Sequence, residues 1–250
     1  MLDSLFQQMN IPEKCYSGRV IPKTAFYEEA NLTSFDKKKI QNDITKVRWL
    51  YVFKPETINI KKFQDETIDY SEVSFIQVEL ENYDYLDKII EIIHKTIQYP
   101  LVLWITCNNK LVISIAEKRK NLADSTKLLV ERIITSQEID LENLSESQIS
   151  FFKLFSIDKF NHTNYYEFYK DIKKLTVSLK TGEYTGKFEE YSNEKSEITL
   201  QLVKEIESCT IQISTLKGRI KTEKQLNRQI EINIEINSLQ NKVLNLTKQL

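Results

Sequence analysis

The chain has 250 residues, of which 41% are hydrophobic and 28% are charged. This composition is that of an ordinary globular protein and argues against intrinsic disorder, and a net charge of −1 gives no global attraction to nucleic acid or to anionic membranes. Only four glycines and four prolines are present, which predicts long regular elements joined by short turns.

The cysteines and the N-terminus indicate the compartment. Cys15, Cys107 and Cys209 are widely spaced, and no CxxC pair or neighbouring histidine accompanies them, so we expect free thiols in a reducing compartment. The N-terminus lacks the basic and apolar regions of a signal peptide, and no uncharged apolar run reaches the roughly 18 residues of a membrane span. We therefore predict a cytoplasmic protein without a membrane-spanning segment.

Residues 1–140 alternate between strand and helix patterns. Ser34 is suited to cap a helix that runs through Ile44, and a second helix opens at Asp84. Runs of β-branched and aromatic residues predict strands at 47–53, 57–60, 73–80, 101–105, 111–115 and 128–134, with 101–105 central and a hairpin turn at Asn108 and Asn109. The order predicts an α+β domain in which a mainly antiparallel sheet of five to six strands carries helices on one face.

Residues 141–186 have helix patterns and are rich in aromatic side chains. Ser145 with Gln148, and Asn164 with Glu167, predict two helix starts, and the glycines at 182 and 186 bracket a linker. We predict that the aromatic group packs between two helices, with a protein interface as the alternative. Its members are Phe151, Phe152, Phe155, Phe160, Tyr165, Tyr166, Phe168 and Tyr169.

Residues 187–250 are predicted to form one long coiled-coil-like helix, because no proline and only Gly218 occur from about Ser196 onward. The helix carries two heptad runs of apolar residues that are out of phase. The seam therefore shifts, or the helix is interrupted near 222–229, or two partners are contacted, or the helix folds back near Gly218. The first run comprises Leu202, Ile206, Cys209, Ile213, Leu216 and Ile220, and the second comprises Ile232, Ile236, Leu239, Val243, Leu246 and Leu250.

Few residues carry catalytic or metal-binding chemistry. The glycines are isolated, which excludes a phosphate-binding loop, and the two histidines lie on different predicted elements, so we predict no metal site and no cofactor. Glu79 and Glu81 on one strand and Lys118 near a neighbouring strand are weak candidates for a metal-dependent nuclease site. The leading Asp and the Glu-x-Lys spacing of such sites are missing, so alternating charge along a strand is the favoured interpretation.

Two basic stretches are candidate contacts for nucleic acid. Lys118, Arg119 and Lys120 are expected at a hairpin tip, where clustered cations contact phosphate, although a solvated turn is the favoured interpretation. The second stretch is spread over several turns of the long helix, so a solvated helix face is favoured over a contact with nucleic acid or an acidic partner. It comprises Lys217, Arg219, Lys221, Lys224 and Arg228.

Several segments together carry a family resemblance: 21–27 (IPKTAFY), 47–51 (VRWLY), 77–80 (QVEL), 99–101 (YPL) and 221–233 (KTEKQLNRQIEIN). They resemble an uncharacterised family of bacterial and archaeal proteins catalogued only as a domain of unknown function, family 4391, and the most distinctive part is 223–228. Members of that family are often encoded beside helicase-like proteins and DNA methyltransferases in restriction or phage-defence clusters. The resemblance therefore implies an accessory subunit, and it implies no catalytic residues.

We predict a non-catalytic adaptor whose C-terminal helix binds a helicase-like protein, a DNA methyltransferase or a second copy of the chain. The alternatives are a nucleic-acid-directed, metal-dependent nuclease or DNA-binding sensor that uses the sheet domain, and a DNA-binding protein that uses the basic stretches. The residues predicted to bind the partner are the apolar Leu202, Ile206, Ile213, Leu216, Ile220, Ile236, Leu239, Val243 and Leu246, and the polar Gln225, Asn227, Arg228, Glu231 and Asn233 where the hydrophobic phase breaks.

Overall fold

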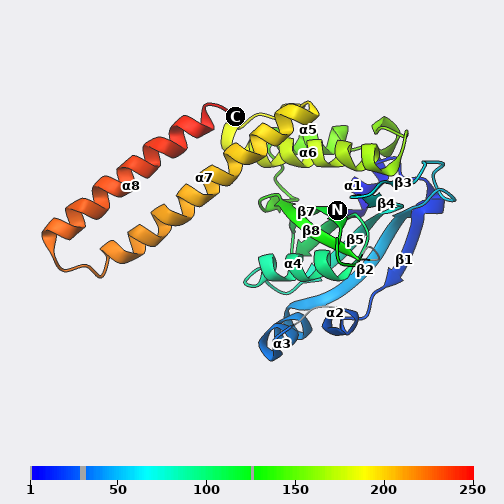
Figure 1. Cartoon of the computed structure of the whole chain (residues 1–250), viewed down its shortest axis with the longest axis horizontal. Helices are drawn as coiled ribbons and strands as arrows, with labels where there is room; N and C mark the ends of the chain where they lie inside the picture. The colour runs from blue at the N-terminus through cyan, green and yellow to red at the C-terminus, as the bar shows by residue number, and fades with distance from the viewer. Residues whose placement is uncertain (1, 29–31, 125–126) are drawn as a thin grey trace.

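A seven-stranded sheet lies at the centre of the computed structural model, which describes residues 2–28, 32–124 and 127–250 (Figure 1). The spatial order of the strands is β1–β2–β5–β6–β7–β8, and β9 pairs with β7. Their bounds are β1 (Tyr16–Val20), β2 (Ile44–Phe53), β5 (Val73–Leu80), β6 (Leu101–Cys107), β7 (Lys110–Lys120), β8 (Leu128–Thr135) and β9 (Ile139–Asp140).

The sheet is mixed, not mainly antiparallel as the sequence predicts. β5 and β6 run parallel, with Ser74 opposite Leu101 and Val78 opposite Ile105, whereas the other neighbouring strands are antiparallel. The reason is α4 (Leu86–Thr96), a crossover helix that joins β5 to β6 and returns the chain to the end of the sheet where β5 began. Both strands are almost entirely buried, as parallel strands are, which confirms the prediction that 101–105 is a central strand.

Local features of the sheet differ from the predicted ones. Residues 57–60 form no strand, and a small sheet of β3 (Phe63–Gln64) and β4 (Asp69–Tyr70) follows them instead. β7 continues to Lys120, so the basic run lies in a strand, while Ser125 of the turn predicted there lies outside the described residues. The turn predicted at Asn108 is confirmed, and its φ of 54° is a left-handed conformation that Asn tolerates.

One face of the sheet is covered by α1 (Leu2–Gln8), α5 (Glu146–Leu154) and α6 (Tyr165–Thr185), with short 3-10 turns at η1 (Glu13–Cys15) and η2 (Ile157–Lys159). Both predicted starts of α5 and α6 are confirmed, because the side chains of Ser145 and Asn164 accept hydrogen bonds from the first turns. The aromatic group packs on the sheet as well as between helices: the Phe155 ring centroid lies 5.5 Å from that of Trp104 and 5.9 Å from that of Phe75.

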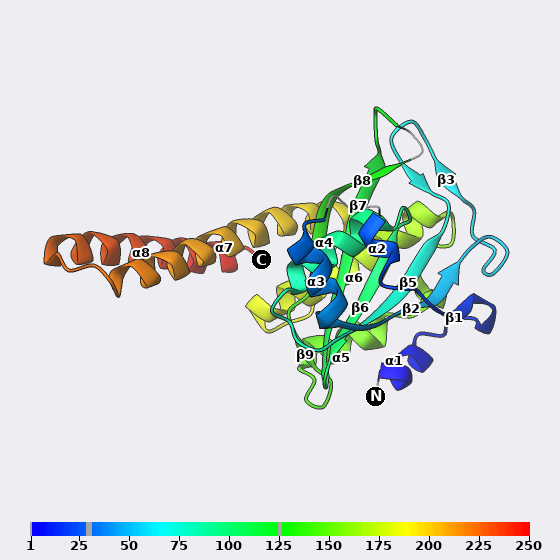
Figure 2. The ribbon, with the colours of Figure 1, turned by 90° about the horizontal axis from the view of Figure 1, so that it is seen from below.

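The opposite face is covered by α2 (Ala25–Glu28), α3 (Ser34–Asp43) and α4, so helices lie on both faces and the predicted one-sided arrangement is wrong (Figure 2). The alternation in β5 explains this arrangement. Phe75 belongs to the core beneath α5 and α6, whereas Ile76 and Val78 belong to the core beneath α3 and α4. Because both sides of the strand are apolar, both need a covering layer.

The C-terminal segment is a helical hairpin that protrudes from the sheet domain (Figures 1 and 2). It consists of α7 (Asn193–Ile220) and α8 (Leu226–Thr247). A long C-terminal helix is therefore present as α7, but the segment is interrupted at 221–225 and folds back there, in agreement with the alternatives of an interruption near 222–229 and a fold-back near Gly218. Glu223 holds the turn: its carboxylate accepts the backbone N–H groups of Lys224 and Gln225 at 2.9 Å each. Gln229 Nε2 donates to the Glu223 carbonyl at 2.7 Å, which closes the turn onto α8.

Candidate functional site

The interior of the hairpin brings the two heptad runs together. Leu216 of α7 and Ile232 and Ile236 of α8 form a buried cluster. In an antiparallel hairpin two out-of-phase runs can face each other, so each run is covered by the other within the same chain. Ile213, Ile220 and Leu239 pack against this cluster, and Ile206, Cys209 and Leu246 are buried nearer the sheet domain.

The residues predicted to bind a partner therefore fall into two groups. The apolar ones contribute to the hairpin itself: Leu216, Ile236, Ile206 and Leu246 are buried, and Leu202, Ile213, Ile220, Leu239 and Val243 are half-buried. The polar ones remain accessible, because Gln225, Asn227, Arg228, Glu231 and Asn233 are all exposed. Their role in partner binding stays a prediction.

The outer face of α8 carries a second set of apolar residues, here called the outer stripe. Leu226, Ile230, Ile234 and Leu244 are 69%, 49%, 63% and 54% exposed. The first three follow at steps of four residues, and the fourth lies about five turns after the first at 3.6 residues per turn, so all four share one face of the helix. The buried Ile232 and Ile236 lie on the opposite face.

The heptad pattern in the sequence does not reveal the outer stripe, because the pattern follows a single seam. A signal was nevertheless present: isoleucine occupies every second position from 230 to 236. In a helix, residues two apart point to nearly opposite sides, so this repeat gives two apolar faces rather than one. In a strand, the same alternating isoleucines would all lie on one face. In the helix, half of them lie on the face away from α7 and form part of the outer stripe.

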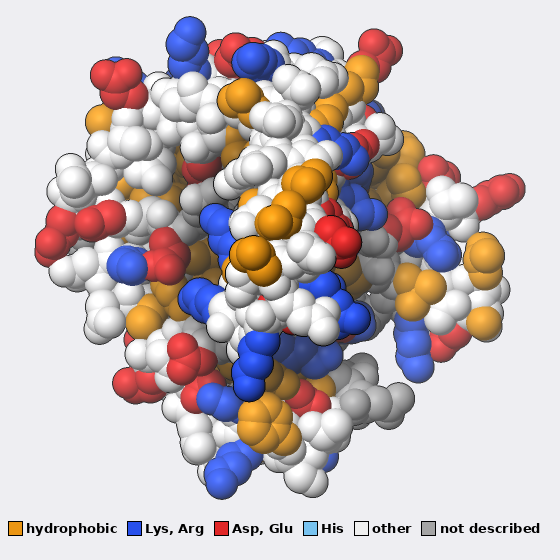
Figure 3. All heavy atoms as spheres, turned by 90° about the vertical axis from the view of Figure 1, so that its left-hand side faces the viewer, with side chains coloured by type: hydrophobic (Ala, Val, Ile, Leu, Met, Phe, Trp, Pro, Cys, Tyr) orange, Lys and Arg blue, Asp and Glu red, His pale blue; other side chains and the backbone are white. Residues whose placement is uncertain are grey.

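The tip of the hairpin gathers positive charge. Figure 3 views the molecule along the hairpin from this end, and Lys and Arg side chains lie close to hydrophobic ones on the protruding segment. Because the chain folds back, the cations of the second basic stretch lie close to the turn between α7 and α8. In one straight helix they would be spread along the helix. The five exposed cations are Lys217, Arg219, Lys221, Lys224 and Arg228.

Four charged side chains fasten the base of α7 to the sheet domain. Arg132 of β8 donates from Nη2 to Glu197 of α7 at 2.7 Å and from Nε to Glu117 of β7 at 2.5 Å. Lys173 of α6 pairs with both carboxylates. Burial alone would raise the pKa of Glu197, but the hydrogen bonds from Lys173 and Arg132 outweigh it and lower that pKa. This network, here called the anchor network, fixes where the hairpin leaves the body.

The weak catalytic candidates Glu79, on β5, and Glu81, just past its end, are engaged in pairs with β2. Glu79 lies 2.8 Å from Arg48 Nη2, and Glu81 accepts a hydrogen bond from Thr45 Oγ1 at 2.9 Å. These contacts hold two antiparallel neighbours in register, which is the role that alternating strand charge predicts.

Lys118, the third catalytic candidate, is remote from both glutamates. The register sets Glu79 opposite Thr106 and Thr106 opposite Leu111, whereas Lys118 lies toward the other end of β7. Lys118 is 3% exposed, and its Nζ donates to the carbonyls of Ile97 and Tyr99 at 2.6 and 2.8 Å, just past the end of α4. Burial lowers the pKa of Lys118 to about 7. The structure therefore does not bring the three candidates together.

The rest of the first basic run is likewise engaged with neighbouring groups. Arg119 Nε lies 2.6 Å from Glu131 Oε1 of β8, and Lys120 Nζ donates to the Asp65 carbonyl at 2.6 Å. The three cations point from a strand to internal partners and do not form a hairpin tip. Among the residues that the structure describes, no group of three or more His, Cys, Asp or Glu side chains is placed to hold a metal ion.

The fold and the site together define an α+β protein with a two-sided mixed sheet and a protruding helical hairpin whose outer surface gathers apolar and cationic side chains. The family model described as Domain of unknown function (DUF4391) matches residues 9–243, and the chain belongs to this family. No curated protein and no solved structure matches the chain. Across 2–28, 32–124 and 127–250, no helix combines the length and apolar character needed to cross a bilayer.

Proposed function

We propose that this protein is a non-catalytic accessory subunit that binds a protein partner through the hairpin. The observation that carries the proposal is the outer stripe, because its four aliphatic side chains are about half or more exposed on a helix whose other face is already buried. Exposed apolar side chains on successive turns of one helix face, as at Leu226, Ile230 and Ile234, are typical of sites that dock on another helix or in a groove. Burying one such side chain stabilises a complex by up to about 1.5–3 kcal/mol.

The cations at the tip support a partner with an acidic surface beside its apolar groove. Exposed charges of this kind contribute little to affinity but steer the encounter and suppress unsuitable partners. Glu223 is the one carboxylate inside the turn, and the hydrogen bond from the backbone N–H of Gln225 lowers its pKa, so it stays ionised at neutral pH. The tip therefore presents five cations around a single structural anion.

The family resemblance favours a helicase-like protein or a DNA methyltransferase of a restriction or anti-phage defence system as the partner, with a second copy of the chain as the other choice. The three cysteines are free and buried, which is compatible with work in the cytoplasm. The apolar residues of the two heptad runs pack α7 against α8. In this proposal the partner therefore contacts the outer stripe and the exposed polar residues of α8.

The proposal is tested by measuring binding of the full chain to each protein encoded beside it, together with sedimentation of the chain alone. Ile230→Asp combined with Ile234→Asp places two charges in the outer stripe and should weaken binding by at least about 100-fold, which corresponds to about 2.7 kcal/mol. Ile198→Asp is the matched control, because Ile198 is 60% exposed but lies on α7 outside the stripe. Equal binding by the wild type and the double variant would contradict the proposal.

A DNA-binding sensor is a second candidate function, which the cationic tip favours. If the tip binds the phosphate backbone, affinity should fall steeply as salt rises, and Lys221→Gln with Lys224→Gln should reduce the salt slope by about 2. Lys14→Gln with Lys153→Gln removes the same charge from exposed positions on the body and should leave the slope unchanged. Failure to bind duplex or single-stranded DNA at low salt would eliminate this candidate.

A further inference from the structure

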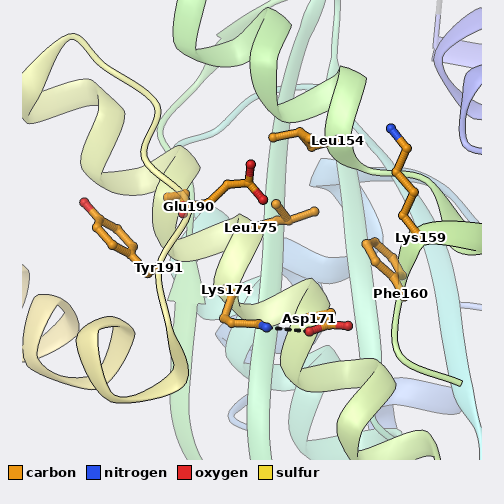
Figure 4. Close-up of a pocket in the computed structure, with 9 residues that line it drawn as sticks. Leu154, Lys159, Phe160, Asp171, Lys174, Leu175, Glu190 and Tyr191 are labelled. Carbon is orange, nitrogen blue, oxygen red and sulfur yellow. Dashed lines mark ion pairs between the residues drawn. The ribbon is translucent and has the colours of Figure 1, made fainter. Parts of the chain in front are cut away.

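A cavity of about 330 Å³ lies beside the base of the hairpin, between α5, α6 and the linker that leads to α7 (Figure 4). Leu154, Phe160, Leu175 and Tyr191 supply its apolar walls. The volume falls within the range of small-molecule sites, and the mixture of apolar walls with a few polar groups is typical of such sites. None of these residues belongs to the outer stripe or the tip, so the cavity is separate from the proposed docking surface.

Ser178 of α6 lines the cavity and has an unused hydroxyl. It is 0% exposed, and its Oγ has no hydrogen-bond partner among the described residues. Two neighbouring threonines of the same helix behave differently: Thr176 Oγ1 donates to the Ile172 carbonyl at 2.8 Å, and Thr181 Oγ1 donates to the Val177 carbonyl at 3.1 Å. Buried hydroxyls are almost always paired, so the Ser178 hydroxyl is an exception in this wall, and at 0% exposure it lies beneath the cavity surface.

The charges at the cavity mouth are balanced but not all paired. Lys174 and Asp171 lie 2.6 Å apart and neutralise each other. Lys159 and Glu190 form no ion pair with any residue that the structure describes, and Lys159 Nζ only donates to the Lys153 carbonyl at 3.3 Å. In Figure 4, Lys159 and Phe160 stand on one side of the cavity and Glu190 and Tyr191 on the other. A cation and an anion without ion-pair partners among the described residues therefore stand on opposite sides of the apolar space.

The geometry points to a binding site for a small zwitterion with an apolar body, that is, an apolar amino acid or a molecule built like one. Its carboxylate pairs with Lys159, its amine pairs with Glu190, and its apolar part lies on Phe160 and Leu175. A purely anionic ligand would meet Glu190, and a purely cationic one would meet Lys159, so each lacks one favourable contact and gains one repulsion.

The test uses the full chain and three related probes in calorimetric or ligand-observed NMR titrations: L-phenylalanine, 3-phenylpropionate without the amine, and phenethylamine without the carboxylate. Phenylalanine should bind up to about fivefold more tightly than either of the others, since an exposed charge pair contributes up to about that factor. Glu190→Gln should abolish the advantage over 3-phenylpropionate, and Lys159→Gln should abolish the advantage over phenethylamine.

Lys153→Gln is the matched control, because Lys153 is exposed and close in sequence but does not line the cavity, and it should retain both advantages. Both charge variants lie at exposed positions, so loss of the fold does not confuse the outcome. The inference is overturned if no probe binds saturably up to about 10 mM, if a singly charged probe binds as tightly as phenylalanine, or if the charge variants leave the preferences unchanged.

Discussion

At the residue scale, the buried His94 and the half-buried Glu183 are expected to give opposite responses of stability to pH. His94 is almost completely buried, and its Nε2 lies 3.2 Å from Ser114 Oγ. Burial, with a smaller effect of Lys118, holds the pKa of His94 well below its usual 6.5. Glu183 is half-buried, and burial raises its pKa from 4.5 to about 7, while one of its carboxylate oxygens accepts the Gln137 N–H at 2.8 Å.

For His94 we predict that stability falls as pH is lowered through about 6.5. In that window the unfolded chain binds a proton and the folded one does not, so the free energy of unfolding decreases by up to about 1.4 kcal/mol per pH unit. Urea unfolding at pH 6.5 and 5.5 should show a loss about 1 kcal/mol larger for the wild type than for His94→Gln. Identical pH dependence of the two proteins would rule out a buried neutral His94.

For Glu183 the sign is reversed, because its folded pKa is raised. The folded state keeps its proton between pH 4.5 and about 7 while the unfolded state loses it, so the wild type becomes less stable as pH rises through this window. Glu183→Gln should therefore stabilise the protein by about 2 kcal/mol at pH 8 and change stability little at pH 4.5, as measured by urea unfolding. The exposed Glu189→Gln is the control, and an equal effect of Glu183→Gln at both pH values would contradict the assignment.

Residue-level roles were the hardest to predict from the sequence. Lys118 has two cationic neighbours in the sequence, and nothing in that pattern indicates that β7 continues through it or that its ammonium reaches the carbonyls past the end of α4. Burial depends on which elements pack together, not on the local pattern. For the histidines, the placement on different predicted elements favoured structural or surface roles, and His94 is buried with its Nε2 near Ser114 Oγ.

At the element scale, α8 has one apolar face packed against α7 and another exposed on the outside of the hairpin. A substitution on each face of α8 tests this assignment. Ile236→Ala removes a buried side chain between α7 and α8 and should lower the local stability of the hairpin by about 2–4 kcal/mol. Ile234→Ala removes the same atoms from the outer stripe and should change it by less than about 0.5 kcal/mol. Amide hydrogen exchange in α8 measures both, and equal protection in the two variants would contradict the assigned faces.

The anchor network should contribute more to the free energy of unfolding than an exposed ion pair does. Lys173→Ala leaves Glu117 and Glu197 close together with only Arg132 to compensate them, and we expect a loss of about 2–3 kcal/mol in urea unfolding. Lys195→Ala removes a pair with Glu189 that is half exposed on both sides, so it should cost less than about 1 kcal/mol. If the two substitutions cost the same, the network does not anchor α7.

The periodicity in the sequence predicts which residues of the C-terminal segment are buried but not what they pack against. In the structure the turn at Glu223 folds α8 back on α7, so the two out-of-phase runs pack against each other. The sequence gives little warning of that turn, because it has neither proline nor glycine and depends on side-chain hydrogen bonds from a glutamate and Gln229. Capping residues were more reliable, since both starts predicted for α5 and α6 are observed, although the cap predicted at Ser34 is Thr33, one residue earlier.

At the scale of the whole molecule, the sheet is mixed because α4 crosses over between β5 and β6, whereas the other neighbouring strands, including β1 and β2 on either side of α2 and α3, are antiparallel. The helix at 86–96 and both of its flanking strands could be predicted from local pattern, but the pairing of β5 beside β6 could not. With that pairing, the two apolar sides of β5 require helices on both faces. The hairpin projects from the sheet domain (Figure 1) and carries the outer stripe on its surface.

The central claim, that the outer stripe of α8 is covered by a protein partner, is tested most directly by the rate of thiol labelling. Cys15, Cys107 and Cys209 are buried, so Ile234→Cys and Ile198→Cys each add one reactive thiol to the full chain. With the partner present, or at concentrations where the chain self-associates, labelling at 234 should slow at least about tenfold while labelling at 198 is unchanged. Unchanged labelling at 234 with every neighbouring protein and at every concentration would contradict the account.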